Sequence, residues 1–438
     1  MGCFRFHAAA PDGHWLNDPN GLVFAEGAYR LFAQHRADPP TFAATGWARL
    51  SSDDLLAWRF DGAVILPEGD DWAYSGSVLR SGDKLEAFHT SHRPGGEAQV
   101  RRVSDDAGAT WRRDPLGVIS DRRARNERDP FVFAYGDEWR MIVARPCDWT
   151  DWQSTPRSTL AVLRSSDRRQ WEFCGAIGPW APVGVMWEVP VLVAIGDRWV
   201  LLVSTVDRRS DEIYCAVRYW LGDFDGSGFA AIDGWPIDGR PLDLGPDFYA
   251  AIVNTPGGWP GDGHMMVAWL SSWKTARGFP WPQGAGGPIS LPRRLELGLD
   301  RLLHSVEPAV SARFRRPAVA VPEAGSGVAD IAGDAAFSLR IEAGRHRLVI
   351  KGDPSTGLVE ISRAAGLDDG LEYHARHHDA LTSRAVRTLR LFVDGPAVEL
   401  FIEPDGQAAS IALPAAGAFD VELSVGGVAV PLRWATLD

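Results

Sequence analysis

The sequence predicts an all-β protein, a five-bladed β-propeller followed by a C-terminal β-sandwich, and two observations support this. A hairpin-like unit occurs five times, beginning near residues 18, 74, 129, 188 and 248, so the spacing is 55 to 60 residues. Of the 19 tryptophans, 18 lie at or before Trp281 and the last is Trp434, which marks a change of domain. Four-strand repeats of this length are typical of propellers, and no long helical periodicity runs through them.

Each unit contains two short strands rich in β-branched and aromatic residues, joined by a tight turn. The three clearest turns are Glu26-Gly27, Gly136-Asp137 and Gly196-Asp197. A polar turn followed by Trp or Phe recurs between units, as in Ser104-Asp105-Asp106 before Trp111, and adds the second pair of strands. In a propeller the first strand of each blade lines the central channel. Residues at the starts of the units are therefore expected to meet at one end of that channel.

Three of the units begin with an acidic residue one or two positions before a proline: Asp18, Asp129 and Glu188. Asp-Pro and Glu-x-Pro also occur as ordinary turn residues. Turn chemistry does not require the same acid each time, so three acids at matching places favour a functional cluster. Paired carboxylates among aromatic side chains are what glycoside hydrolysis requires, because one ionised carboxylate attacks or stabilises the sugar and one carboxyl donates a proton.

The propeller is expected over residues 1–300 and the sandwich over 301–438, with a linker region at about 301–327. The stretch 317–327 is rich in Pro and Gly, as connecting segments are. Beyond it, 389–395 and 398–402 alternate apolar and polar residues, which predicts antiparallel strands.

Composition argues against several other classes of function. The net charge of −12 argues against a nucleic-acid partner, and no apolar run reaches membrane length. The four cysteines, Cys3, Cys147, Cys174 and Cys215, form no CxxC pair and are expected to be reduced thiols. The first strand motif begins by His14, which leaves no room for a signal peptide, so the expected location is cytoplasmic.

The stretch His-Trp-Leu-Asn-Asp-Pro-Asn-Gly at 14–21 resembles the Trp-Met-Asn-Asp-Pro-Asn-Gly motif of glycoside hydrolase family 32, the β-fructofuranosidases. Arg128-Asp129-Pro130 resembles the Arg-Asp-Pro motif of that family, and Trp187-Glu188-Val189-Pro190 resembles its Trp-Glu-Cys-Pro motif. The resemblance extends over nearly the whole chain, and 389–401 is similar to part of the sandwich domain of the family.

The resemblance implies a role for each acid. Asp18 would be the nucleophile that forms a covalent fructosyl-enzyme, Glu188 the general acid and then the general base, and Asp129 the residue that grips fructose hydroxyls in the transition state. It implies no metal and no cofactor. It also implies a set of substrate-binding residues: Asn17, Gln34, Phe42, Trp47, Tyr74, Ser75, Arg128, Tyr249 and Trp273.

Several positions depart from the pattern of the family, among them 47–50, where Trp-Ala-Arg-Leu replaces Trp-Gly-His-Ala near the outer sugar sites. Val189 replaces the usual Cys beside Glu188, which bears on the pH optimum. Phe42 stands where Trp is common, which keeps an apolar wall but removes an indole donor. His35 replaces an aromatic residue after Gln34. The last two changes bear on the choice of leaving group.

The expected function is a retaining β-fructofuranosidase acting on a small carbohydrate, sucrose or a fructo-oligosaccharide. A fructosyltransferase would use the same three carboxylates, an inverting arabinosidase-like hydrolase would hold its carboxylates farther apart, and a glycan-binding propeller would not need them. The stretch 374–379 contains three histidines, but their spacing fits no usual metal site. The sandwich is expected to be structural or to join identical chains into an oligomer.

Overall fold

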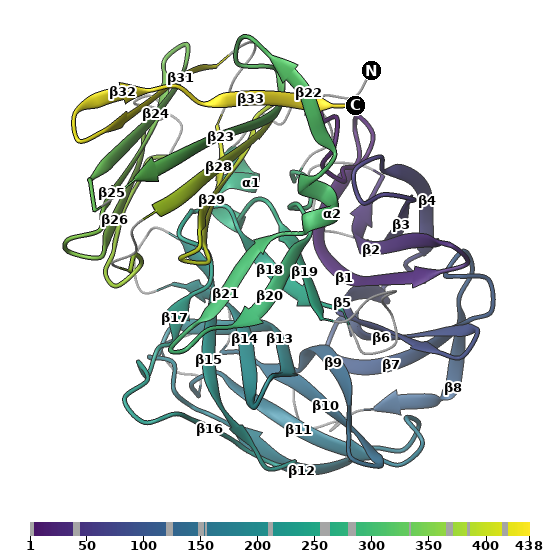
Figure 1. Cartoon of the computed structure of the whole chain (residues 1–438). Coiled ribbons are helices and arrows are strands. Elements are labelled where there is room, and N and C mark those ends of the chain that lie inside the picture. The colour runs from purple at the N-terminus through teal and green to yellow at the C-terminus, as the bar shows by residue number, and fades with distance from the viewer. Residues whose placement is uncertain are drawn as a thin grey trace.

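The structure is a computed structural model, and it describes residues 4–37, 44–119, 126–147, 153, 156–208, 213–254, 263–278, 286–332, 334–364, 371–382, 386–413 and 419–438. The described residues form an all-β fold (Figure 1) with two short helices, α1 (Trp273–Gly278) and α2 (Pro308–Ser311). Within these ranges, no helix is long and apolar enough to cross a membrane.

Residues up to Val306 form five small antiparallel sheets, each built from consecutive strands. The first two sheets are β1 (Trp15–Ala25), β2 (Ala28–Arg36), β3 (Gly46–Ser52), β4 (Arg59–Ile65) and β5 (Trp72–Ser81), β6 (Lys84–Arg93), β7 (Gly96–Ser104), β8 (Arg112–Ile119). The third is β9 (Arg128–Tyr135), β10 (Glu138–Arg145), β11 (Thr159–Ser165), β12 (Glu172–Ile177). The fourth is β13 (Val185–Ile195), β14 (Arg198–Asp207), β15 (Tyr214–Phe224), β16 (Phe229–Ala231), with β17 (Arg240–Pro241) also paired to β15. The fifth is β18 (Tyr249–Val253), β19 (His264–Trp269), β20 (Arg293–Leu297), β21 (Leu302–Val306).

The repeated hairpins of the sequence are confirmed by the strand registers. Ala25 pairs with Ala28 across the Glu26-Gly27 turn, and the Gly136-Asp137 and Gly196-Asp197 turns likewise join directly paired strands. The recurring polar turns also share their bonding, because the aspartates at 54, 106 and 167 each accept backbone N–H groups of the turn that follows. Repetition in the sequence thus corresponds to repetition in local structure.

The first strands of the five sheets, β1, β5, β9, β13 and β18, contact one another in a closed order. β1 contacts β5, β5 contacts β9, β9 contacts β13, β13 contacts β18, and β18 returns to β1. Figure 1 shows the five sheets arranged around these strands. Residues at equivalent places on the first strands are therefore brought together from distant parts of the chain.

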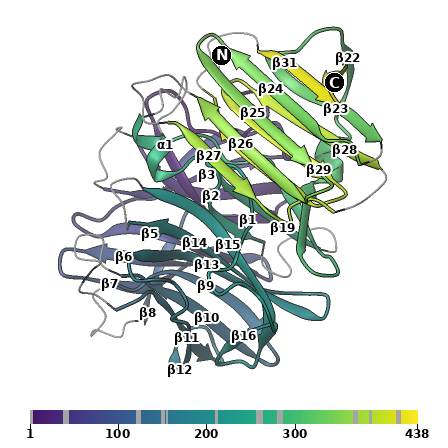
Figure 2. The same cartoon turned by 90° about the vertical axis from the view of Figure 1, so that its left-hand side faces the viewer.

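The remaining strands form two six-stranded antiparallel sheets, called here the C-terminal sheets, which lie along one side of the five small sheets (Figure 2). One contains, in spatial order, β22 (Phe314–Ala318), β33 (Arg433–Leu437), β23 (Ala324–Ala332), β28 (Val386–Asp394), β29 (Ala397–Glu403), β30 (Gln407–Ala412). The other contains β27 (Tyr373–His377), β26 (Leu358–Ala364), β25 (His346–Asp353), β24 (Phe337–Ala343), β31 (Asp420–Val425), β32 (Val428–Val430). Alternate residues of both sheets, such as Leu339 and Leu400, share one buried core. Sheet membership changes between Val306 and Phe314. Within the expected linker of about 301–327 lie β21 and β22, and β23 begins there. The predicted division at residue 300 stays a prediction.

Candidate active site

The candidate site lies where the first strands are locally irregular. All five carry a shift of register at the same place, between Leu16 and Gly21 in β1 and between Glu188 and Val191 in β13, for example. In three of them a residue other than glycine has a positive φ: 63° at Asp129, 45° at Val189 and 52° at Ala250. Bulges and left-handed residues cluster at functional sites because they redirect side chains at a cost in strain.

Asp18 is held by neutral hydrogen-bond donors alone among the described residues. Its Oδ2 accepts from Ser75 Oγ at 2.8 Å and its Oδ1 from Asn17 Nδ2 at 3.1 Å. Gln34 closes a ring, because its Oε1 accepts from Asn17 at 2.6 Å and its Nε2 donates to Ser75 at 2.9 Å. Trp15 Nε1 donates to Asn17 Oδ1 at 2.8 Å and so fixes which way the amide faces. The four predicted residues of this group therefore meet.

Burial raises the pKa of Asp18 to about 6, and the nearby charge of Glu188 adds to the shift. The hydrogen bonds from Ser75 and Asn17 oppose it, because they favour the ionised form. Asp18 is only 7% exposed, so little water reaches its carboxylate. It is ionised at neutral pH, as a nucleophile must be, and its charge is poorly compensated.

Asp129 accepts a backbone bond from the next sheet rather than a side-chain bond. Its Oδ2 accepts from the backbone N–H of Val189 at 2.9 Å, and its own N–H donates to Thr90 Oγ1 at 2.9 Å. Burial raises the pKa of Asp129 well above its ordinary value, with the charges of Glu188 and Asp18 acting in the same direction. The three predicted carboxylates are thus close enough to act on one another, although they lie 111 and 59 residues apart in the chain.

Glu188 is bonded by residues at the equivalent position of the neighbouring first strands. Tyr249 OH donates to its Oε2 at 2.7 Å, and Arg128 Nη1 lies 3.2 Å from its Oε1. In β9, β13 and β18 the residue with positive φ follows directly after Arg128, Glu188 and Tyr249. Asp129 is itself that residue in β9. Glu188 therefore does not occupy the same place as the two aspartates, which explains why it lies two residues before its proline and they lie one before theirs.

Sequence reasoning missed Glu97, which anchors Arg128. Glu97 binds the Arg128 guanidinium at 3.0 and 3.2 Å and is buried in β7. Burial opposes the charge of Arg128, but the charges of Glu97, Glu188 and Asp129 outweigh it and raise the pKa of the guanidinium. The arginine is thus held between a structural and a candidate catalytic carboxylate. No motif marks Glu97 in the sequence, because it comes from the third strand of its sheet.

The aromatic residues of the implied substrate-binding set lie in different surroundings. Tyr74 is half-buried and stacks on His92, with ring centroids 4.3 Å apart. Trp273 opens α1 and packs edge-on against Trp269 at 5.2 Å. Trp47 has no exposed surface and donates its indole N–H to the backbone carbonyl of Tyr74, so it supports Tyr74 from the core and offers no surface to a substrate. Phe42 lies outside the described residues.

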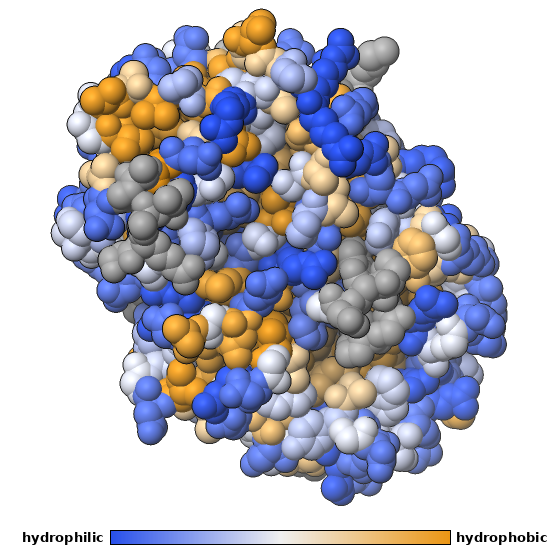
Figure 3. Space-filling view, in the orientation of Figure 1, coloured by the Kyte–Doolittle hydropathy of each residue, from blue (hydrophilic) through white to orange (hydrophobic). Residues whose placement is uncertain are grey.

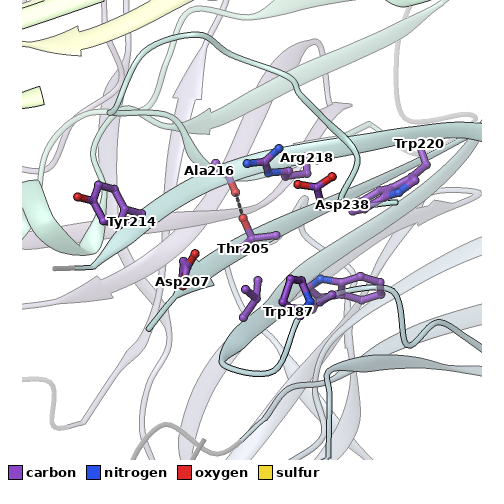
Figure 4. A pocket seen from close by; sticks show the side chains of 11 residues that line it. Trp187, Thr205, Asp207, Tyr214, Ala216, Arg218, Trp220 and Asp238 are labelled. Atoms are coloured by element: carbon purple, nitrogen blue, oxygen red, sulfur yellow. Dashed lines mark hydrogen bonds between the residues drawn. The ribbon is translucent and has the colours of Figure 1, made fainter. Parts of the chain in front are cut away.

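Trp187 does not line the same space as its neighbour Glu188. Its ring packs at 5.6 Å from Trp220 and borders a separate cavity of about 100 Å³ (Figure 4). Thr205 and Asp207 of β14 and Arg218 of β15 also line that cavity. Alternation along β13 sends adjacent side chains to opposite sides, so Trp187 faces this cavity while Glu188 faces Tyr249 and Arg128.

Metal ligands are not assembled in the part of the chain that the structure describes, where no three His, Cys, Asp or Glu side chains converge as a metal site. Of the 374–379 stretch, His377 Nε2 instead lies 2.9 Å from the carbonyl of Leu244.

Comparison with known proteins places most of this chain in one family. Residues 7–305 match the model of the glycosyl hydrolases family 32 N-terminal domain. The levanase of Bacillus subtilis is 28% identical over 311 residues, which are 66% of this chain and 44% of the levanase. The invertase of Wickerhamomyces anomalus is 27% identical over 302 residues, 62% of this chain and 52% of the invertase. The chain thus spans about half the length of these curated relatives.

A solved exo-inulinase from Aspergillus awamori has a similar fold, with a TM-score of 0.81 at 20% sequence identity over 99% of this chain and 97% of that one. The likeness therefore includes the C-terminal sheets, which the family model does not reach. With a family model matching more than half of its residues, from before the first acid to the end of the fifth sheet, this chain belongs to glycoside hydrolase family 32.

Proposed function

We propose that this chain is a retaining β-fructofuranosidase that releases fructose from a β-fructoside such as sucrose or a short fructan. The observation that carries the proposal is the meeting of Asp18, Asp129 and Glu188, three buried or half-buried carboxylates with Arg128 beside them. Such a concentration of like charge is costly, and it is typical of sites that use it chemically. The curated relatives named levanase and invertase support fructosides as the substrate class.

In the proposed reaction, an Asp18 oxygen attacks the anomeric carbon of the fructosyl unit and forms a covalent ester. The bond from that carbon to the leaving oxygen breaks as Glu188 donates its proton to that oxygen. Water then attacks the same carbon, Glu188 takes a proton from that water, and Asp18 leaves as a carboxylate. Asp129 would hold fructose hydroxyls that bind more tightly in the transition state, and Asn17, Gln34 and Ser75 would orient Asp18.

We also propose the finer architecture. The closed order of contacts among the first strands supports a five-bladed propeller, and the shared core of the C-terminal sheets supports a β-sandwich. Hydrophobic residues gather on the surface over β24, β31 and β32 (Figure 3), where Val428 is 67% exposed. This surface supports association of identical chains through the sandwich, which a sedimentation measurement would test. The cytoplasmic location stays a prediction.

The proposal is tested with Asp18→Asn and Glu188→Gln, assayed for released fructose on sucrose, sucrose 6-phosphate, inulin and levan. Each variant should lose activity by about four orders of magnitude, because its nucleophile or its acid is gone. Asp61→Asn removes an acid of the same first sheet that binds Arg49 and should keep its activity. Near wild-type turnover in either site variant would contradict the assigned roles.

Two further measurements separate the alternatives. Oligofructosides as the main product at high sucrose would indicate a transferase, whereas free fructose indicates a hydrolase. The anomer first released, read by NMR, distinguishes retention from the inverting reaction of an arabinosidase-like enzyme. A glycan-binding protein would bind these sugars without releasing any product.

A further inference from the structure

Two buried arginines of the C-terminal sheets are equally enclosed but differ in what they contact. Arg363 of β26 is 2% exposed, and its Nη1 lies 2.5 Å from Asp247 Oδ2. Asp247 belongs to the segment just before β18, so this ion pair crosses from the C-terminal sheets to the five small sheets. Arg387 of β28 is also fully buried, but its partner Asp405, at 2.7 Å, lies between β29 and β30 of its own sheet.

Asp247 is fully buried and uses both carboxylate oxygens. Oδ2 accepts from Arg363 and from the backbone N–H of Ala412 at 2.7 Å. Oδ1 accepts a hydrogen bond from the hydroxyl of Thr275, in the middle of α1. Because a buried carboxylate is stable only when its charge is paired and bonded, Arg363 is the group that keeps Asp247 in this place.

Both neighbours of Asp247 lead to the candidate site. Two residues along the chain, Tyr249 donates its hydroxyl to Glu188 at 2.7 Å. The second partner of Asp247, Thr275, belongs to α1, and the first residue of α1 is Trp273. The same helix contacts β15, because Lys274 Nζ lies 5.6 Å from the ring centroid of Tyr214. The carboxylate of Asp247 therefore lies next to the residue that donates to Glu188 and holds the helix that begins with Trp273, a predicted substrate-binding residue.

We propose that Arg363 and Asp247 are positioning residues, through which the C-terminal sheets set the place of Tyr249 and of α1 at the candidate active site. The C-terminal sheets then contribute to the reaction and not to stability alone. This inference rests on the proposed function, since it assigns a purpose to the contact between Tyr249 and Glu188. Positions of this kind matter because displacing a catalytic group by about 1 Å costs up to about 100-fold in rate.

The test compares Arg363→Gln with Arg387→Gln in the full-length protein. Each variant removes one buried arginine of the C-terminal sheets and leaves one buried aspartate without its ion pair, so a general loss of stability is matched. Arg363→Gln should lower kcat/KM on the best substrate about 10-fold, while Arg387→Gln stays near wild type. Thr275→Val, which loosens α1 only, should raise KM and leave kcat nearly unchanged. Arg363→Lys keeps the charge and should recover part of the loss.

Hydrogen exchange gives a second reading that needs no substrate. Peptides covering α1 and 247–253 should exchange faster in Arg363→Gln than in wild type, and should be unchanged in Arg387→Gln. An equal fall of kcat/KM in the two glutamine variants, or unchanged exchange at α1 in Arg363→Gln, would overturn the inference. If Arg363→Gln does not fold, Thr275→Val and Arg363→Lys decide by the same two measurements. A wild-type protein inactive on all β-fructosides would instead refute the proposed function, and the exchange data would still decide this coupling.

Discussion

Buried carboxylates occur in two regions of this molecule, and they are compensated in different ways. At the candidate site, Asp18 accepts only from neutral donors among the described residues, and Arg128 is shared between Glu97 and Glu188. At the seam, meaning the boundary of the five small sheets with the C-terminal sheets, buried acids bind cations directly and share them: Arg293 binds Glu399 and Asp243, and His7 binds Glu399 and Asp394. Glu399, for example, binds Arg293 at 2.5 Å and His7 at 2.9 Å.

The titration behaviour follows from this difference. Burial acts against ionisation in both regions, but at Glu399 the charges of Arg293 and His7 outweigh it and hold the pKa below its ordinary value. Asp243, which binds Arg293 without His7, has its pKa raised by burial. His7 shows the reverse, since its bonds to Asp394 and Glu399 overcome burial and raise its pKa to about 9. At Asp18, burial is not overcome and the pKa rises to about 6. At the seam, ion pairs such as that of Glu399 with Arg293 join the two groups of sheets. At the site, the charge of Asp18 is left without a cation that binds it, as perturbed catalytic groups often are.

The largest expected effect comes from breaking the compensation at the seam. Glu399→Gln should lower the free energy of unfolding by about 3–5 kcal/mol, because it leaves the buried charge of Arg293 only partly paired. Because its folded-state pKa is depressed, Glu399 stabilises the protein above its ordinary pKa, and that contribution is lost as pH falls through the folded value. Urea unfolding of Glu399→Gln and of Glu172→Gln, an exposed partner of Arg164, measures the difference. Equal losses would show that the seam pairs do not carry the stability assigned to them.

At the candidate site the same kind of change should stabilise the protein. Asp18→Asn removes a carboxylate whose folded-state pKa is raised, and should increase the free energy of unfolding by about 2 kcal/mol near pH 8 while activity is lost. The folded wild-type protein binds the Asp18 proton more tightly than the unfolded chain does, so its free energy of unfolding rises as pH falls through about 6. The stability advantage of Asp18→Asn should therefore shrink in acid. Urea unfolding of both proteins at neutral and acidic pH measures this. A less stable Asp18→Asn near pH 8 would contradict the view that this charge is uncompensated.

Local pattern predicted the hairpins and the convergence of the acids, because turn pairs such as Gly136-Asp137 and the places of Asp18 and Asp129 repeat along the chain. The pattern did not indicate that Trp47 is buried behind Tyr74, or that Trp187 packs on Trp220 and not beside the Glu188 carboxylate. Both depend on which side of its strand a residue faces.

Contacts between distant segments were also beyond the sequence. Glu97 and Asp247 lie outside the matched positions of the acids, and each has its role from a partner far along the chain, Arg128 and Arg363. Nothing local to either residue indicates such a partner. The electrostatic contrast between site and seam could therefore be seen only once the sheets were assembled.

A smaller change should sharpen the account of Asp18 by moving its titration. Ser75→Ala removes a hydrogen bond that favours the ionised form, so the pKa of Asp18 should rise further. The acidic limb of kcat/KM against pH, expected near 6 in wild type, should then move to higher pH by about half a unit to one unit. Ser77→Ala is the matched control, because Ser77 is buried in the same strand but donates to the carbonyl of Pro130. A limb that stays in place in Ser75→Ala would show that this bond does not set the charge of the nucleophile.

The smallest effect is expected at Val189, the position where the family usually has Cys. The group that reaches Asp129 is the backbone N–H of Val189, aimed by a φ of 45°, while the side chain packs in the apolar core. Val189→Cys leaves that N–H in place and removes β-branching at a left-handed residue, where branched side chains are strained. The acidic limb of kcat/KM should therefore coincide with that of wild type, and kcat should change by no more than about twofold. A shift of the limb as large as that of Ser75→Ala would mean that the side chain at 189, and not the backbone, tunes the carboxylates.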